Sequence, residues 1–253
     1  MDQHHLKAFY ENKEYYQKLR DKTSSRYKQY LDIVHNWKIK HLYEVLSKEL
    51  TISSIIEIGT ATGELLRYFP LDTPLENRTG LDISTNHVIE AKKRYPEINF
   101  YDIDFEDFAA KVDKKYDLII LSDIIEHIPN DELFLKLAGK ISNYVLLNLP
   151  LEKCHEFRNR EYGPNDYRGH LRAYSLEDAR ILVKKAGLDE IHYLTKYYVK
   201  STVFRRYLWN KLVNRKGYFA KLTGFLRYLF ELLEIALRYK RYKSNYFALL
   251  KSQ

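Results

Sequence analysis

Short apolar runs alternate with amphipathic stretches through the middle of this chain. The apolar runs predict strands at 52–58, 78–83, 97–101, 116–122 and 143–149, and the amphipathic stretches predict helices at 63–69, 85–95 and 130–141. A helix at 175–186, a sixth strand at 190–199 and a last strand at 244–251 complete the series. Strands covered on both faces run as continuous apolar segments, and alternation with helices is typical of a parallel sheet. The pattern therefore predicts an α/β fold with helices on both faces of the sheet.

Periodicity also predicts helices outside this alternation. Residues 1 to about 34 form a helical lead-in rich in Tyr, Lys and Glu, and a further helix is expected from Trp37 to Glu49. Between the sixth and last strands, apolar residues recur at three- and four-residue spacing, which predicts a helical insertion; they are Leu222, Phe225, Leu226, Leu229, Leu233 and Ala236. The expected parts are an N-terminal helical cap at 1–50, a main domain at 51–199 plus 244–253, and a basic helical insertion at 200–243.

A loop of small residues follows the first predicted strand. It contains Gly59, Ala61 and Gly63, and Glu57 stands near the end of the strand. Glycine lets the backbone turn sharply and leaves room for a ligand, and such loops hold nucleotide-like cofactors at the carboxyl edge of a parallel sheet. The spacing fails the dinucleotide pattern G-x-G-x-x-G at two of its three glycines, and no Lys-Ser/Thr pair follows as in a phosphate-binding P-loop. The loop thus predicts a nucleotide-like ligand other than NAD.

Acidic residues follow the next strands at positions that suit such a ligand. Asp82 ends the second predicted strand, 19 residues after Gly63, where a carboxylate can accept hydrogen bonds from both ribose hydroxyls. Asp104 follows the third strand, and the pair Glu126-His127 follows the fourth. All of these positions lie at the predicted carboxyl edge of the sheet.

The segment E-I-G-x-A-x-G at residues 57–63 resembles motif I of the class I S-adenosylmethionine (SAM) methyltransferases. Ala61 stands where that family more often has glycine. Asp82, Asp104 and the Glu126-His127 pair follow in the order of the family's landmarks. The resemblance implies a Rossmann-like seven-stranded sheet, parallel except for one antiparallel strand, with the last strand between the fifth and the sixth. It also implies S-adenosyl-L-methionine as the cofactor.

The same resemblance assigns donor-binding roles at the strand ends. In the family, an acidic residue after the third strand meets the adenine amino group and an apolar neighbour packs on the ring. Asp104 and Phe105 match these positions, with Asp102 and Ile103 as the competing register. The expected cofactor-binding residues are Glu57, Gly59, Ala61, Gly63, Asp82, Ile83, Asp104, Phe105 and Ser122.

Two histidines are the candidate catalytic residues. Methyl transfer to a hydroxyl needs close alignment of donor and acceptor and removal of the hydroxyl proton. His127 suits this role because a neutral imidazole accepts protons near neutral pH; the alternative is that it packs against or orients the donor. His170 lies in a long aperiodic loop, 149–172, and is expected to assist. Arg168 or Arg172 could hold an acceptor phosphate or carboxylate, unless the loop is a lid ordered by its own salt bridges. No metal is expected, because the histidines and acids of this loop match no compact metal motif.

Positive charge is concentrated in the insertion. The formal net charge is +8, yet residues 200–243 alone hold 12 Lys/Arg against 2 Asp/Glu. A basic amphipathic helix can lie on a membrane surface, bind an anionic partner, or simply pack on its own domain. No apolar run is long enough to span a bilayer, and the single cysteine, Cys154, excludes an internal disulfide framework and suggests a reducing compartment. The expected location is cytoplasmic, with peripheral membrane contact through 200–243 as an open alternative.

These features favour a SAM-dependent O-methyltransferase. The expected acceptor is a hydroxyl of a small molecule, a sugar or a lipid-linked glycan intermediate. An RNA methyltransferase that uses the basic insertion is one alternative, but residues 122–125 lack the Asn/Asp-Pro-Pro-aromatic run of the nucleic-acid amino-methyltransferases. Nucleic acid is therefore a disfavoured partner. A SAM-binding protein without turnover is the second alternative, and the sequence does not specify an oligomeric state.

Overall fold

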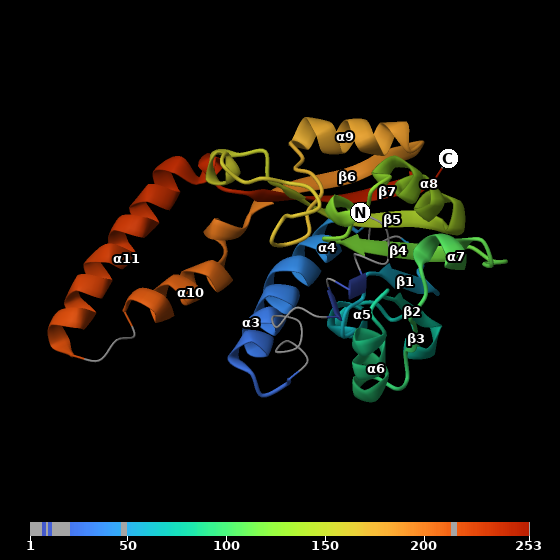
Figure 1. The fold of residues 1–253 in the computed structure, drawn as a ribbon, viewed down its shortest axis with the longest axis horizontal. Coiled ribbons are helices and arrows are strands. Elements are labelled where there is room, and N and C mark those ends of the chain that lie inside the picture. Colours follow the sequence, from blue (N-terminus) through green and yellow to red (C-terminus); the bar gives the residue numbers. More distant parts are fainter. Residues whose placement is uncertain (1–6, 9, 12–20, 47–49, 214–216, 253) are drawn as a thin grey trace.

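Seven strands form one sheet in the order β3-β2-β1-β4-β5-β7-β6 (Figure 1). The structure is a computed structural model that describes residues 7–8, 10–11, 21–46, 50–213 and 217–252. The strands are β1 Ile55–Ile58, β2 Arg78–Leu81, β3 Asn99–Tyr101, β4 Tyr116–Ser122, β5 Ser142–Leu151, β6 Leu188–Tyr197 and β7 Ser244–Ser252. β7 runs antiparallel between β5 and β6, whereas all pairs among β1 to β5 are parallel. The expected Rossmann-like sheet with one antiparallel strand is confirmed.

Helices cover both faces of this sheet. They are α4 Lys40–Val45, α5 Glu64–Tyr68, α6 Thr85–Arg94, α7 Phe105–Ala109, α8 Asp131–Ile141 and α9 Leu176–Lys185. Successive side chains of a strand point to opposite faces. Ile56 and Ile119 accordingly pack with apolar residues of α7, α8 and α9, while Ile55 and Leu118 pack with those of α4, α5 and α6. Burial on both faces explains why the strand sequences are continuously apolar.

Several of these helices have a side-chain cap at their N-terminus. Ser84 accepts a hydrogen bond from the His87 N–H at the start of α6. Ser175 and Asp178 form a reciprocal capping box at the start of α9. The α7 helix is not among the predicted elements, because five residues are too few to show a period; Asp104 caps it.

The N-terminal helices form one continuous run rather than two separate helices. α3 (Ser25–Ile33) passes into a π-helical segment, η1 (Val34–Ile39), and then into α4. The predicted break before Trp37 is therefore wrong, and the run ends at Val45, while 47–49 lie outside the described residues. Most of the predicted lead-in before residue 21 also lies outside them. π-helical turns shift the face of a helix, and here Trp37 and Lys38 both face the cavity described below.

The insertion forms an arm of two helices that stands away from the sheet (Figure 1). α10 (Thr202–Leu212) and α11 (Tyr218–Arg238) pack against each other, and a Cβ placed on Gly224 would meet the Leu212 carbonyl. α11 buries only Gly224 and Ile235 among its residues. Its exposed apolar side chains include Phe219, Leu226, Phe230, Leu233 and Leu237. Among the described helices, none is both long enough and apolar enough to cross a bilayer.

Candidate active site

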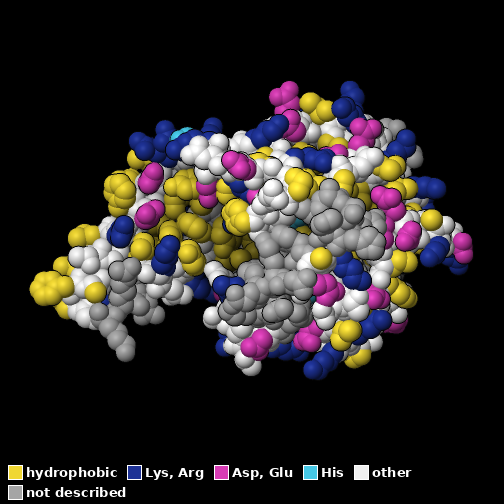
Figure 2. Space-filling view, viewed as in Figure 1, with side chains coloured by type: hydrophobic (Ala, Val, Ile, Leu, Met, Phe, Trp, Pro, Cys, Tyr) yellow, Lys and Arg dark blue, Asp and Glu magenta, His cyan; other side chains and the backbone are white. Residues whose placement is uncertain are grey.

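A cavity of about 1070 Å³ lies at the carboxyl ends of β1, β2 and β4. The sheet contributes the strand ends and the loops that follow them, including Gly59, Asp82 and Ser122. Aromatic residues near the base of the arm line the other side; they are Tyr198, Phe204, Tyr207 and Tyr242. Figure 2 shows hydrophobic side chains gathered between the arm and the main domain. The cavity thus joins a polar sheet edge to an apolar and aromatic wall.

The glycine loop is tied to β2 by its backbone. The N–H groups of Gly59 and Thr60 both donate to the Leu81 carbonyl, at 2.8 and 3.0 Å. Ala61 adopts φ +48°, a left-handed conformation that glycine takes more readily than alanine. This conformation explains why glycine is the more usual residue at the position of Ala61. Gly59 and Ala61 both line the cavity, as expected for donor-binding residues.

Glu57 and Gly63 support the loop and are not among the residues that line the cavity. Gly63 has φ +85°, and a Cβ there would lie 2.7 Å from Phe100 Cζ, so a larger residue does not fit. Glu57 Oε2 accepts a hydrogen bond from Thr60 Oγ1 at 2.9 Å. Burial raises the pKa of Glu57 to about 8. The structure therefore shows a supporting role for both residues, and their direct contact with a donor stays a prediction.

Asp82 lines the cavity and connects two loops through hydrogen bonds to their backbones. Its Oδ2 accepts from the Ala61 N–H and its Oδ1 from the Ser84 N–H, both at 2.8 Å. His87 Nδ1 lies 3.3 Å from the same Oδ1. A carboxylate has about four lone-pair sites, so acceptor capacity remains for further hydroxyl donors. Asp82 and its neighbour Ile83 both line the cavity.

Asp104 and Phe105 form the cavity wall after β3. Asp104 Oδ1 accepts from the Glu106 and Asp107 N–H groups, at 2.8 and 3.4 Å. Its Oδ2 has no hydrogen-bond partner among the described residues and is available to a ligand. Phe105 packs on Phe134, with ring centroids 4.6 Å apart. In the competing register, Ile103 lines the cavity, but Asp102 is exposed and does not.

A chain of amides crosses the ends of three strands beside Ser122. Asn148 Nδ2 donates to Ser122 Oγ at 2.9 Å, and Asn245 Nδ2 donates to Asn148 Oδ1 at 2.7 Å. Ser122 and Asn245 both line the cavity. Asn245 is a site residue that the sequence did not single out, since its place beside β5 depends on the antiparallel insertion of β7.

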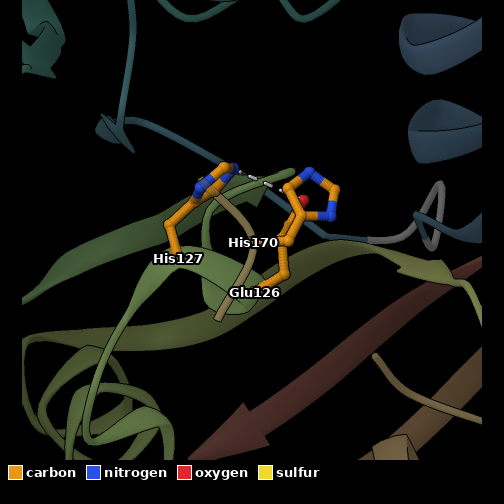
Figure 3. Close-up of side chains that lie close together, drawn as sticks. All are labelled: Glu126, His127 and His170. Carbon is orange, nitrogen blue, oxygen red and sulfur yellow. Dashed lines mark ion pairs between the residues drawn. The ribbon is translucent and has the colours of Figure 1, made fainter. Parts of the chain in front are cut away.

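His127, His170 and Glu126 meet at one side of the cavity (Figure 3). Glu126 and His127 lie in a short helical turn, η3 (Ile125–His127), directly after β4, and the two imidazole centroids are 4.8 Å apart. His127 Nδ1 lies 2.9 Å from the Gly169 carbonyl, which can only accept, so Nδ1 carries the proton and Nε2 the lone pair. Burial, with His170 beside it, lowers the pKa of His127 to about 4. Burial and the nearby Asp123 raise the pKa of Glu126 well above its usual range.

A buried arginine clamp holds the loop that carries His170. Arg160 donates to both oxygens of Asp166, at 2.8 and 2.7 Å, and to Glu152 Oε2 at 2.8 Å. Burial alone would raise the pKa of Asp166, but these bonds lower it below its usual range. Glu152 Oε2 also lies 2.8 Å from His170 Nδ1. The loop is therefore ordered by its own salt bridges, and that order places His170 in the cavity.

The two arginines that were candidates for binding an acceptor lie in different environments. Arg172 donates to the Pro129 carbonyl and pairs with Asp131 at 2.6 Å, and it does not line the cavity. Arg168 does line it and keeps a side chain that is 43% exposed. Of the two, only Arg168 lies at the cavity, where its Nη1 is 4.0 Å from Glu152 Oε1.

An ion pair between Lys38 and Asp123 is the main feature of the site that the sequence reasoning missed. Lys38 Nζ lies 2.5 Å from Asp123 Oδ2, and both residues line the cavity. Burial alone would lower the pKa of Lys38, but Asp123 raises it. Asp123 has φ +52°, a strained value for a residue other than glycine. Its position after β4 was a usable signal, whereas nothing local in the sequence points Lys38 of η1 into the cavity.

This fold is that of a class I SAM-dependent methyltransferase. A family model described as "Methyltransferase domain" matches residues 7–193, so the chain belongs to this family. S-adenosylmethionine is the cofactor of the family, and the donor side of the cavity fits it: the Asp82 carboxylate and the free Asp104 Oδ2 face a space large enough for a nucleoside.

Solved structures share the fold at low sequence identity. Magnesium protoporphyrin IX methyltransferase (ChlM) from Synechocystis PCC 6803 with bound SAH is 14% identical over 99% of this chain and 100% of that one, with a TM-score of 0.62. The cyclopropane synthase MmaA2 from Mycobacterium tuberculosis is 12% identical over 98% and 97%, with a TM-score of 0.59. The plantazolicin methyltransferase BpumL in complex with SAH is 16% identical over 98% and 94%, with a TM-score of 0.57. A search of curated proteins gave no match.

Proposed function

We propose that this protein transfers a methyl group from SAM to a hydroxyl oxygen of a small molecule, a sugar or a lipid-linked glycan intermediate. The observation that carries the proposal is the pair of imidazoles, His127 and His170, on one side of the cavity. Such a pair serves a hydroxyl acceptor, which must lose a proton on methylation. A carbon or sulfur acceptor depends less on a neighbouring base that removes a proton.

The donor-binding residues lie at the ends of β1, β2 and β3. The Asp82 carboxylate is positioned for ribose hydroxyls, and Asp104 Oδ2 for the adenine amino group, with Phe105 beside it. When bound, the donor supplies a methyl group already activated by a sulfonium. The work left to the protein is to align the acceptor and to accept its proton.

His127 Nε2 is the group placed to accept that proton. Its Nδ1–H is held by the Gly169 carbonyl, which fixes the ring and its tautomer. The new C–O bond forms as the S–CH3 bond breaks, the electron pair of that bond leaves with sulfur, and the hydroxyl proton passes to Nε2. Glu126 Oε1 lies 3.8 Å from the same Nε2. His170 positions the acceptor from the same side of the cavity, with its ring centroid 4.8 Å from that of His127.

The arm favours an acceptor that is attached to an apolar or membrane-bound carrier. Its base lines the cavity with aromatic side chains, and α11 exposes Phe219, Phe230 and Leu237 by 64% to 79%. The segment 200–243 also carries 12 Lys/Arg against 2 Asp/Glu. Apolar side chains beside basic ones suit the surface of a bilayer that contains anionic lipids.

Labelled SAM tests the proposed reaction. Incubation of the protein with methyl-labelled SAM and a lipid and metabolite extract should yield a product that carries the label on oxygen. His127→Ala should leave SAM affinity within about threefold and lower the transfer rate by ~100-fold, as expected for loss of a general base. His155→Asn is the matched control, because His155 lies in the same loop as His170 but outside the cavity lining. Donor binding without transfer to any acceptor would support a non-catalytic SAM-binding protein instead.

Vesicle binding tests the role of the arm separately. Wild type should sediment with vesicles that contain anionic phosphatidylglycerol, and a double variant, Phe219→Ser with Phe230→Ser, should not. The exposed side chain Ile89 of α6 offers a control, Ile89→Ser, on the main domain. Equal sedimentation of all three proteins would exclude the arm as the contact.

A further inference from the structure

Glu126, His127 and His170 have the chemistry of a metal centre. One potential ligand atom from each residue lies within 4.8 Å of the other two, and all three side chains are buried (Figure 3). Two imidazole nitrogens and one carboxylate form a donor set that first-row transition metals prefer. Glu126 and His127 come from η3, whereas His170 comes from the loop after β5. Because these two segments are far apart in the sequence, the three residues form no compact sequence motif.

The hydrogen bonds of both histidines leave one nitrogen free for an ion. His127 Nδ1 donates to the Gly169 carbonyl at 2.9 Å and lies 3.2 Å from Tyr10 Oη. His170 Nδ1 lies 2.8 Å from Glu152 Oε2, a carboxylate that Arg160 also holds. Metal-binding histidines usually donate their other N–H to a carbonyl or carboxylate, which fixes the ring and directs the second nitrogen to the metal. Both rings here show that arrangement, with Nε2 as the remaining nitrogen.

Glu126 supplies the third and least explained group. Its side chain is 2% exposed, and its Oε2 is buried with no hydrogen-bond partner among the described residues. Buried polar atoms are nearly always paired, so an unpaired carboxylate oxygen needs a reason. A cation bound beside it would provide the missing partner.

We propose that Glu126, His127 and His170 bind a divalent transition-metal ion on the acceptor side of the cavity. Two ligands ~2.1 Å from a tetrahedral ion lie ~3.4 Å apart, so the side chains need to close by at most ~1.4 Å. Three protein ligands leave a coordination position open, and all three residues line the cavity. An acceptor hydroxyl oxygen can take that position.

This inference rests on the proposed O-methyl transfer and changes the role of one atom in it. With an ion bound, Nε2 of His127 is a ligand and no longer the proton acceptor. The ion lowers the pKa of the hydroxyl, as it does for bound water, and the proton leaves to solvent water. The C–O bond still forms as the S–CH3 bond breaks, with the electron pair leaving on sulfur.

Calorimetry and Co²⁺ absorption test the site without reference to activity. The full chain, treated with EDTA and desalted, is titrated with Zn²⁺, Mn²⁺ or Co²⁺ alone. Wild type should bind one ion per chain, and Co²⁺ should give visible d–d bands. His170→Ala and Glu126→Gln should each weaken binding at least tenfold, while the control His155→Asn should match wild type. Circular dichroism and SAM binding show that each variant is folded.

The outcomes separate this proposal from the proposed function. Absence of stoichiometric binding in wild type, or equal binding in His170→Ala, overturns the metal site. If the ion binds but no hydroxyl is methylated when the ion and SAM are both present, the metal site is supported and the proposed O-methyl transfer is refuted. If transfer survives EDTA at the full rate, the function stands and the ion is not part of it.

Discussion

Replacing Asp82 by asparagine should weaken SAM binding and loosen the glycine loop at once. The two carboxylate oxygens accept from two different backbone N–H groups, those of Ala61 and Ser84, each at 2.8 Å. An asparagine side chain has only one oxygen, so one of these N–H groups must face an amide NH2. Hydrogen bonds to a charged group contribute ~1.5–3 kcal/mol each. The loss of one of them should lower the free energy of unfolding by that amount.

The effect on the donor follows from the same carboxylate. Ribose hydroxyls that donate to a charged oxygen bind about twice as strongly as they do to a neutral one. The loss of ~1.5–3 kcal/mol at this contact corresponds to a Kd for SAM that is ~10- to 150-fold higher. Isothermal titration calorimetry measures the affinity, and urea denaturation measures the stability. Asp102→Asn is the matched control, because Asp102 is exposed and does not line the cavity.

Two results would refute this reasoning about Asp82. A Kd for SAM within twofold of wild type would show that its carboxylate does not hold the donor. Unchanged stability in urea would show that the two backbone hydrogen bonds contribute little. A loss of stability with intact SAM affinity would leave Asp82 as a brace of the loop alone.

Three further changes test how the donor side is supported. Arg94→Met should cost ~3–5 kcal/mol of stability in urea, because it leaves Glu64 buried without its 2.5 Å partner, and adding Glu64→Gln should recover part of the loss. Glu57→Gln should change the pH profile of thermal unfolding. Burial raises the pKa of Glu57 from 4.5 to about 8, so wild type should lose stability relative to the variant as pH rises through this window, and parallel profiles would exclude that shift. Gly80→Ala should cost ~1–3 kcal/mol, since its Cβ would lie 2.5 Å from Phe100, and an unchanged Tm would contradict that crowding.

Local sequence signals were enough to predict which residues lie at the carboxyl edge of the sheet. The apolar runs, the positive-φ glycine Gly63 and the capping serines Ser84 and Ser175 each act within a few residues of their own position. Parallel pairing then brings the strand ends to one edge of the sheet. For this reason Gly59, Ala61, Asp82 and Ser122 all line the cavity at that edge.

Long-range contacts explain what could not be predicted. His127 meets the backbone of Gly169, 42 residues away, only because the Arg160 clamp folds the loop after β5 back over η3. Lys38 reaches Asp123 because η1 continues the N-terminal helix across the sheet. No period or motif in the sequence encodes either contact. The wrong helix boundary before Trp37 has the same origin, because packing stabilises a π-helical turn that local propensity does not favour.

The difference between local and long-range contacts helps to explain how proteins with this fold can act on different substrates. ChlM, MmaA2 and BpumL share the sheet with this chain at 12% to 16% identity, yet their names describe a porphyrin methyltransferase, a cyclopropane synthase and a plantazolicin methyltransferase. The fold alone therefore cannot identify the acceptor. In this chain the proposed acceptor side consists of η3, the clamped loop and the base of the arm, none of which hydrogen-bonds to the glycine loop. Changes at His127 or His170 should consequently alter transfer and leave SAM affinity intact, whereas a change at Asp82 should weaken donor binding for every acceptor.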